Sequence, residues 1–470
     1  MGRRRKIDKV VTEMTITGIA DKGKAVGRDE NGQVIFVKDV VPGDVVDVKV
    51  IRKRKKYMEA IPTHFHKYSD DRVEPFCEYF GVCGGCKWQN LAYEAQLRHK
   101  AQHVEDVMTR IGKIEIGKIL PLIPADKTSF YRNKLEFSFC NKRWLTPEEL
   151  NTDVSNVEDV LGFHKAGAWD KIVNIDKCHL QEDPSNAIRN AAKQIGIDQG
   201  LEFFDARAQT GSLRNMIIRV TTLGQVMVIM VYNDPDEAKR TAHLDELYRQ
   251  FPTITSLNYC INTKANDFIM DLDIVLYQGV GYIEEKMGDV QFRIGPKSFF
   301  QTNTLQAIRL YDQVAAFANL TGTENVYDLY TGIGSIALYL AHQCKQVVGI
   351  EEIEMAIKDA AVNAEINNID NAVFYAGDVK DILTEDFAKK HGKADVIITD
   401  PPRSGMHAKV VNMLLELEAP HIVYVSCNPA TQARDMNLLK EKYEVEKIQA
   451  VDMFPQTHHL ESIALLTLKQ

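Results

Sequence analysis

The fold of this chain is decided by residues 325–334, Asn325-Val326-Tyr327-Asp328-Leu329-Tyr330-Thr331-Gly332-Ile333-Gly334. The first six have the apolar and β-branched character of a strand, and a glycine-rich turn follows them. Residues 335–342 then predict a helix, and residues 346–351 predict a second strand. A strand that passes through such a turn into a helix is typical of the first unit of a doubly wound parallel sheet.

The alternation of helices and strands continues to the C-terminus. Apolar residues recur at helical spacing over 353–364. Five further strand segments follow: 372–376, 395–399, 421–425, 445–452 and 461–468. The last two form a hairpin. Because alternating units of this length build a parallel sheet with helices on its faces, we expect a Rossmann-like α/β domain over 291–470.

Residues 1–64 have a different pattern. Short apolar segments such as 34–37 and 45–50 are separated by glycine and proline, and helical periodicity is absent. Short strands joined by tight turns predict a small β-barrel of the oligonucleotide-binding kind.

Residues 65–290 read as an α+β central domain whose topology the pattern does not assign. A cysteine-rich loop comes first, and a helix is predicted over 92–111, which could pack on the C-terminal domain. Segment 134–139 alternates polar and apolar residues, as a half-buried strand does. Segment 226–232 is apolar throughout, which is typical of a strand buried on both faces.

Composition and charge narrow the class of protein. The chain is 45% hydrophobic and 26% charged, without an apolar run near the roughly 18 residues that span a membrane. The basic segment 1–6 is not followed by an apolar stretch, so we expect no secretory signal and a cytoplasmic protein.

The net charge of −8 conceals an asymmetry. Residues 1–67 hold 16 Lys and Arg against 9 Asp and Glu, a local +7 that leaves −15 for the rest. A basic module on an acidic body suggests a polyanionic partner. For a single cluster such as 52–56, a solvated charged surface is an equally good explanation.

The glycine-rich turn predicts a cofactor site at the carboxyl edge of the sheet. Its two glycines let a ligand approach the backbone, and Glu351, at the end of the next strand, can accept hydrogen bonds from ribose hydroxyls. This pairing fits an adenosine-containing cofactor. NAD is the rival, since Ala337 occupies the third small position of its fingerprint. Asp328, an acid before the turn, favours a cofactor with a positively charged amino-acid part.

Three later motifs bear on the chemistry. They are Asp400-Pro401-Pro402-Arg403-Ser404-Gly405, Ser426-Cys427-Asn428-Pro429, and the segment 452–461, which ends in His458-His459-Leu460-Glu461. Asp400 and Cys427 each follow a buried strand directly, so both are expected at the sheet edge beside the cofactor. A cysteine after a strand is more often a small buried residue, and Asp-Pro-Pro is often only a turn.

Together these motifs resemble the RNA uracil-5 methyltransferases, and the resemblance spans nearly the whole chain. A basic TRAM barrel joined to an iron–sulfur cluster is similar to the branch that modifies 23S rRNA, whereas the tRNA-specific branch typically lacks both. Further matching segments are 131–134, 211–215 and 299–303. Ser335 departs from the pattern, because many relatives carry Asn there.

The resemblance implies a class I methyltransferase domain, S-adenosylmethionine as cofactor and 23S rRNA as partner. Carbon 5 of uracil is a poor nucleophile, and addition of a thiolate to carbon 6 activates it. Cys427 would be that nucleophile, Glu461 the base that removes the proton from carbon 5, and Asp400 a group that orients the uracil. The residues implied for the cofactor pocket are Gln301, Tyr330, Ser335, Glu351, Asp378 and Asp400.

Four cysteines form a candidate metal site: Cys77, Cys83, Cys86 and Cys178. Spacing alone admits zinc or an iron–sulfur cluster, since each accepts four thiolates. The resemblance implies a [4Fe–4S] cluster. The other three, Cys140, Cys260 and Cys344, are expected to be core residues.

Other functions stay open at this point. The chain could be a tRNA uracil-5 methyltransferase, an RNA cytosine-5 methyltransferase, an inactive RNA-binding iron–sulfur protein or, more remotely, a dehydrogenase. Neither a membrane nor a protein partner is predicted.

Overall fold

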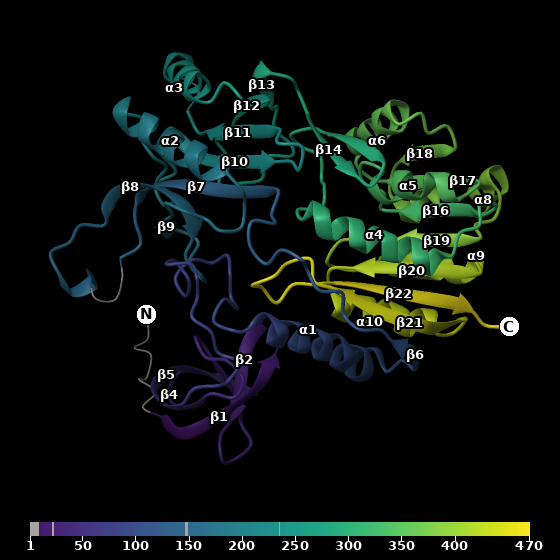
Figure 1. Cartoon of the computed structure of the whole chain (residues 1–470), viewed down its shortest axis with the longest axis horizontal. Helices are drawn as coiled ribbons and strands as arrows, with labels where there is room; N and C mark the ends of the chain where they lie inside the picture. Colours follow the sequence, from purple (N-terminus) through teal and green to yellow (C-terminus); the bar gives the residue numbers. More distant parts are fainter. Residues whose placement is uncertain (1–8, 21–22, 146–148, 235) are drawn as a thin grey trace.

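The computed structural model of the 470-residue chain describes residues 9–20, 23–145, 149–234 and 236–470. The basic segment 1–6 lies outside these ranges. Figure 1 shows three parts: a barrel, a mixed sheet, and a larger α/β part that carries the C-terminus. Within the described ranges, no helix is long and apolar enough to cross a membrane.

The N-terminal part is a closed five-stranded barrel with the strand order β1-β2-β3-β5-β4. Its strands are β1 (Val10–Ala20), β2 (Lys24–Arg28), β3 (Val34–Val37), β4 (Val45–Lys53) and β5 (Tyr57–Lys67). Alternate residues such as Val46, Val48 and Val50 are buried in the barrel, and the residues between them face outward. The predicted small barrel is confirmed.

The chain next forms α1 (Tyr93–Val107), continued by a π-helical turn over Met108–Gly112. The helix predicted over 92–111 is therefore present. The short strand β6 (Ile116–Ile119) pairs in parallel with the C-terminal sheet. Segment 93–119 thus packs on the C-terminal part although it precedes the central sheet in sequence (Figure 1).

The central sheet has seven strands in the order β13-β12-β11-β10-β7-β8-β9. These are β7 (Lys134–Lys142), β8 (Val157–His164), β9 (Ile172–Asn174), β10 (Leu213–Val220), β11 (Val226–Tyr232), β12 (Ser256–Ile261) and β13 (Val275–Gly279). A 3-10 turn spans Glu149–Asn151. Helices α2 (Ser185–Asp198) and α3 (Glu237–Gln250) cover one face. On the other face, Ile217, Met227 and Ile229 join the core of the C-terminal part.

The C-terminal sheet has the order β18-β17-β16-β19-β20-β22-β21-β6. Its strands are β16 (Asn325–Leu329), β17 (Gln346–Glu351), β18 (Ala372–Ala376), β19 (Val396–Thr399), β20 (His421–Ser426), β21 (Tyr443–Val451) and β22 (Glu461–Leu468). The first five are parallel, while β22 is antiparallel to both β20 and β21. The predicted doubly wound sheet with its final hairpin is confirmed.

Helices flank this sheet on both faces. They are α4 (Thr304–Ala318), α5 (Ser335–Leu340), α6 (Glu354–Ile366), α7 (Val379–Ile382), α8 (Glu385–His391), α9 (Ala408–Leu417) and α10 (Pro429–Leu439), with a 3-10 turn over Ala341–Gln343. The hairpin β14 (Ile283–Met287) and β15 (Val290–Ile294) packs against α4, α5 and α6. From β16 the chain builds outward to β18 and then returns to β19, so the strand order reverses between β16 and β19. Ligands of open α/β sheets bind at such a point.

Candidate functional site

The carboxyl ends of β16, β19 and β20 lie side by side at this switch point. The registers pair Leu329 with Thr399, and Thr399 with Tyr424. The backbone N–H of Asp400 donates to the carbonyl of Leu329 at 3.4 Å. The three segments that follow these strands therefore converge at one edge, as the sequence predicted for Asp400 and Cys427.

Strand β22 brings Glu461 to the same edge from the far end of the chain. It runs antiparallel to β20, and the last pair of the ladder is Ser426 with Ser462. Cys427 follows Ser426 and Glu461 precedes Ser462, so both residues lie at this end of the ladder, and Glu461 acts electrostatically on Cys427. Burial and the charges of Glu461 and Asp400 raise the pKa of the Cys427 thiol to about 11, and Arg403 acts to lower it.

Two buried carboxyl groups, Asp328 and Glu461, and the half-buried Asp400 lie at this edge. Burial raises the pKa of Asp328 to about 7, against a hydrogen bond of 2.5 Å from the Thr331 hydroxyl. Burial and the neighbouring Asp328 raise the pKa of Asp400 to about 7. Burial and Asp400 raise the pKa of Glu461 well above its usual range. Carboxyl groups so placed favour a ligand that brings positive charge or hydrogen-bond donors.

The two glycines of the turn, Gly332 and Gly334, have different structural roles. Gly334 has a φ of +78°, and a Cβ there would meet Phe374, Leu338 and Ala360 within 3.3 Å, so this glycine permits helix–strand packing. Gly332 has a φ of +58°, and a Cβ there would have open space around it. The backbone at Gly332 is therefore accessible to a ligand, which fits a cofactor cradle.

Among the other residues predicted for the cofactor, Glu351 contacts this turn directly. Glu351 accepts hydrogen bonds from the backbone N–H groups of Gly332 at 3.1 Å and Ile353 at 3.0 Å. Each carboxylate oxygen can accept a second bond, so a ribose remains a possible partner. Asp378 caps α7 and pairs with Lys380, which holds the pKa of Asp378 below its usual range.

Tyr330, Ser335 and Gln301 complete the predicted set. Tyr330 has a φ of +66°, and burial, together with Asp378 and Glu351 among its acidic neighbours, raises its pKa to about 12. The Ser335 hydroxyl lies 2.9 Å from the Tyr311 hydroxyl, inside the start of α5. Gln301 is buried, and its carbonyl accepts a hydrogen bond of 2.8 Å from Asn133 of the central part.

The loop 452–460, which carries Glu461, is held by a buried ion pair. Lys100 of α1 donates to Asp452 Oδ1 at 2.6 Å, and both side chains are 0% exposed. Lys100 also donates to the carbonyl of Phe454 at 3.1 Å, and the Tyr93 hydroxyl donates to Asp452 Oδ2 at 2.9 Å. An ion pair excluded from water fixes its partners strongly only when further hydrogen bonds satisfy it, as here.

The middle of the loop is held from three more directions. Gln96 of α1 accepts from the Gln456 N–H at 2.9 Å and donates to its side chain at 3.0 Å. The N–H groups of Lys87 and Trp88 both donate to the Gln456 carbonyl. From the central part, the Tyr131 hydroxyl donates to the carbonyl of Pro455 at 3.0 Å.

Sequence reasoning missed Lys100, Gln96 and Arg403. Gln96 and Lys100 are four residues apart and so share one face of α1, but polar residues on a helix usually face solvent. Arg403 belongs to the Asp-Pro-Pro motif, yet its position beside Cys427 depends on how the segment after β19 folds.

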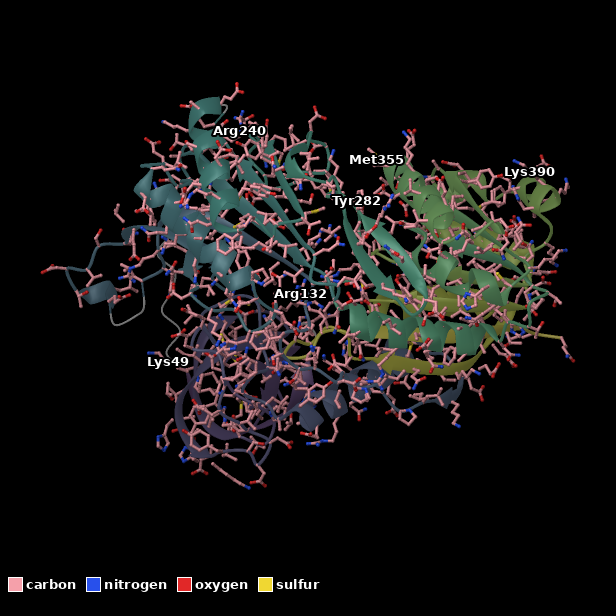
Figure 2. All side chains as sticks on the ribbon, turned by 45° about the horizontal axis from the view of Figure 1, so that its top comes forward. Lys49, Arg132, Arg240, Tyr282, Met355 and Lys390 are labelled. Carbon is pink, nitrogen blue, oxygen red and sulfur yellow. The ribbon has the colours of Figure 1, made fainter. Side chains whose placement is uncertain are left out.

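Figure 2 shows Arg132 close to the place where the three parts of the chain meet. Its guanidinium lies 5.8 Å from the ring of Phe454, in the loop.

Cys77, Cys83, Cys86 and Cys178 line one cavity in the central part, together with aromatic and apolar side chains. Burial raises the pKa of Cys83 to about 11 and that of Cys86 to about 12. Within the described ranges, no group of three or more His, Cys, Asp or Glu side chains is arranged to hold a metal ion. Apart from Cys427, the other cysteines, Cys140, Cys260 and Cys344, are buried.

Comparison with known proteins places this site in a family. The family model for tRNA (uracil-5-)-methyltransferases matches residues 204–469, and that for the TRAM domain matches residues 10–63. An uncharacterized RNA methyltransferase of Bacteroides thetaiotaomicron is 52% identical over 460 residues, which cover 96% of this chain and 100% of that protein. One from Porphyromonas gingivalis is 48% identical over 96% of this chain and 99% of the relative.

A solved structure agrees over the whole chain. It is that of the Pyrococcus abyssi tRNA (uracil-54, C5)-methyltransferase in complex with S-adenosyl-L-homocysteine. The TM-score is 0.75 at 29% identity, and the alignment covers 97% of this chain and 99% of that one. The fold and the site thus define an S-adenosylmethionine-dependent RNA methyltransferase. More particularly, the chain belongs to the tRNA (uracil-5-)-methyltransferase family and carries a TRAM domain.

Gly332→Val tests the cofactor cradle. We expect it to weaken binding of S-adenosylhomocysteine by about 10- to 100-fold, because steric overlap of this kind costs roughly 1–3 kcal/mol. Gly322→Val is the matched control, since Gly322 also has a positive φ and open space around a Cβ but lies before β16. Isothermal titration calorimetry measures both. Equal affinities of the two variants would exclude the cradle.

Lys100→Met tests the buried ion pair. The change leaves Asp452 charged and buried, so we expect a loss of about 3–5 kcal/mol in the free energy of unfolding. Lys358→Met, which removes the exposed pair with Glu354, should cost at most about 1 kcal/mol. Urea unfolding followed by circular dichroism compares them. A loss as small as that of the control would contradict the anchoring role.

Proposed function

We propose that this protein transfers a methyl group from S-adenosylmethionine to carbon 5 of a uridine in 23S rRNA, through a covalent adduct of Cys427 with uracil carbon 6. The observation that carries the proposal is the β20–β22 ladder, which ends at Ser426 and Ser462, the neighbours of Cys427 and Glu461. This chemistry requires a nucleophile and a base that can both reach the same uracil ring.

Cys427 opens the reaction. Its thiol must lose a proton before it adds, and the nearby Arg403 cation favours the thiolate against the carboxyl groups beside it. Addition of Sγ to carbon 6 places electron density on carbon 5, which would then take the methyl group as the bond from that group to the cofactor's sulfur breaks and leaves S-adenosylhomocysteine. S-adenosylmethionine supplies that group when bound.

Glu461 closes the reaction. It removes the proton from carbon 5, the bond between carbon 6 and Sγ breaks, and the Cys427 thiolate is regenerated. Within the described part of the chain, Glu461 Oε2 is buried without a hydrogen-bond partner, so it can accept this proton. Burial raises the pKa of Glu461, and a carboxylate with a raised pKa is a stronger base.

The remaining site residues hold the two reactants. Asp400 is affected by the charge of Asp328 and in turn affects Glu461, and its role would be to orient the uracil beside the cofactor. Gln301, Tyr330, Ser335, Glu351 and Asp378 line the cofactor pocket around Gly332. Carboxyl groups at this edge stabilise the positive charge of the cofactor's amino-acid part.

The RNA is held by the barrel and by the central part, which we propose as separate RNA-binding domains over 1–64 and 65–290. A TRAM domain and a basic N-terminal segment support a polyanionic partner. The second candidate substrate is tRNA, favoured by the Pyrococcus abyssi neighbour, whose described activity is on tRNA uracil-54. In either RNA the target base must leave its stack, at roughly a few kcal/mol.

The four cysteines of the central cavity are proposed to hold a [4Fe–4S] cluster. They line one cavity, which Cys178 reaches from a segment about 90 residues after Cys86. Four thiolates suit either zinc or an iron–sulfur cluster, and the family resemblance favours the cluster. Because Lys87 and Trp88 follow Cys86 and hold Gln456, the group would support the loop that carries Glu461.

Nucleoside analysis tests the function. We expect 23S rRNA from cells without this protein to lose 5-methyluridine, and the wild-type and Cys344→Ala proteins to restore it fully. Cys427→Ala should restore none, because addition to carbon 6 needs the thiolate. Glu461→Gln should accumulate a protein–RNA adduct that survives a denaturing gel, because the bond to Sγ breaks only after carbon 5 loses its proton. If 5-methyluridine were lost from tRNA instead, the substrate would be tRNA. If it were lost from neither RNA, uracil methylation would be refuted.

Metal analysis tests the cluster. Protein purified without oxygen should contain about four iron and four sulfide per chain, with broad visible absorption. Cys83→Ser should lose both, while Cys344→Ser, at a buried cysteine outside the cavity, should keep them. One zinc per chain in place of iron would overturn the assignment.

A further inference from the structure

A second cavity lies in the central part, away from the Cys427 site. It opens on the face of β7 and β10 that α2 and α3 leave uncovered. The lining residues that matter are Ser138, His164, Trp169, Arg214, Asn215 and Asp267. None of the roles assigned above uses them.

The polar groups of the cavity leave one acceptor unsatisfied. Asn215 is 4% exposed, and its Nδ2 donates to the Ser138 hydroxyl at 3.1 Å. Ser138 in turn lies 3.3 Å from His164 Nε2. Within the described residues, Asn215 Oδ1 has no hydrogen-bond partner. A buried acceptor without a partner is unfavourable, so this atom points to a ligand that brings an N–H group.

Trp169 supplies a flat surface at the mouth of the cavity. Its side chain is 65% exposed although it is large and apolar. Exposed aromatic rings beside polar groups are typical of surfaces on which unpaired bases stack. The cavity therefore offers both a stacking surface and an edge that accepts a hydrogen bond.

The charges of the cavity exclude an anion as its main ligand. The guanidinium of Arg214 forms an ion pair with Asp267 at 3.0 Å and donates hydrogen bonds to backbone carbonyls. Asp170, another lining residue, pairs with Arg207 at 2.5 Å. With these cations already paired, a phosphate would gain little, and a neutral ring with N–H donors fits better.

The same face of β7 and β10 leads from the cavity to the core of the C-terminal part, which Ile217 joins. Arg219 and Lys134 are paired in the β7–β10 register, four residues from the pair of Asn215 and Ser138. Arg219 is buried and donates to the carbonyl of Ser298 at 2.6 Å. Asn133, next to Lys134, contacts Gln301 and Thr304. At about 3.3 Å per residue, Ser138 is about 17 Å from Asn133 along the strand, a span of a few nucleotides.

We propose that this cavity is a second nucleobase-binding pocket, which takes an unpaired base of the bound RNA a few nucleotides from the target uridine. The base stacks on Trp169 and donates an N–H to Asn215 Oδ1. Phosphate contacts place a strand and base contacts select its sequence, so the pocket contributes to substrate choice. The proposal rests on the proposed function only in taking RNA as the substrate.

Binding measurements without cofactor test the pocket. The probes are an end-labelled 12-nucleotide oligoadenylate and the same sugar–phosphate chain without bases, followed by fluorescence anisotropy. Trp169→Ala should raise the Kd for oligoadenylate about tenfold, the usual size of a lost stacking contact, and leave the Kd for the abasic chain unchanged. Asn215→Ala should act in the same direction. Trp169→Phe, which keeps a ring, should recover most of the affinity.

Leu150→Ala is the control, since Leu150 is also an exposed apolar residue of the central part but does not line the cavity. Its Kd should match that of the wild type for both probes. The pocket is refuted if Trp169→Ala leaves oligoadenylate binding intact, or weakens both probes equally. Because no methyl transfer is measured, failure of uracil methylation would leave this result unaffected.

Discussion

Strand β22 pairs with β20 from His421–Thr467 to Ser426–Ser462, and this antiparallel ladder is the constraint on which the site depends. Side chains in a strand alternate between faces, so a shift of one residue would turn Glu461 away from Cys427. Buried apolar residues such as Val423, Val425, Ile463 and Leu465 occupy both strands and would be exposed or misplaced by that shift. The same packing that stabilises the sheet therefore sets the position of the two groups that we propose to react.

The ladder alone does not hold the loop before β22. The buried pair of Lys100 and Asp452 ties it to α1, and Gln96 and Trp88 hold Gln456. The Trp88 indole also donates to the carbonyl of Gly23 in the barrel, at 3.1 Å, and a Cβ on Gly23 would lie 2.8 Å from His458. All three parts of the chain thus meet at this loop (Figure 1). RNA bound by the outer parts would be positioned directly against the reacting residues.

The edge of the sheet concentrates buried carboxyl groups, which is unfavourable for an isolated protein. Burial and mutual repulsion raise the pKa values of Asp328, Asp400 and Glu461 together. Such perturbed groups cluster where a protein binds or reacts with a ligand of complementary charge. Binding of a cationic cofactor would offset the free-energy cost of burying these carboxyl groups. The empty site is therefore electrostatically less favourable than the occupied one.

The sequence by itself determined the local features: the barrel, the βα units, the glycine-rich turn and the strand ends that carry Asp400 and Cys427. These depend on residue periodicity and on glycine, which act over a few residues. Only the tertiary structure decided that β6 joins the far sheet, that Lys100 is buried against Asp452, and that Cys178 shares a cavity with Cys83. It alone placed Asn215, whose Oδ1 has no hydrogen-bond partner among the described residues, in the cavity that Trp169 also lines. Each of these contacts joins segments distant in sequence, where many partners are compatible with the local pattern and packing of the whole chain selects one.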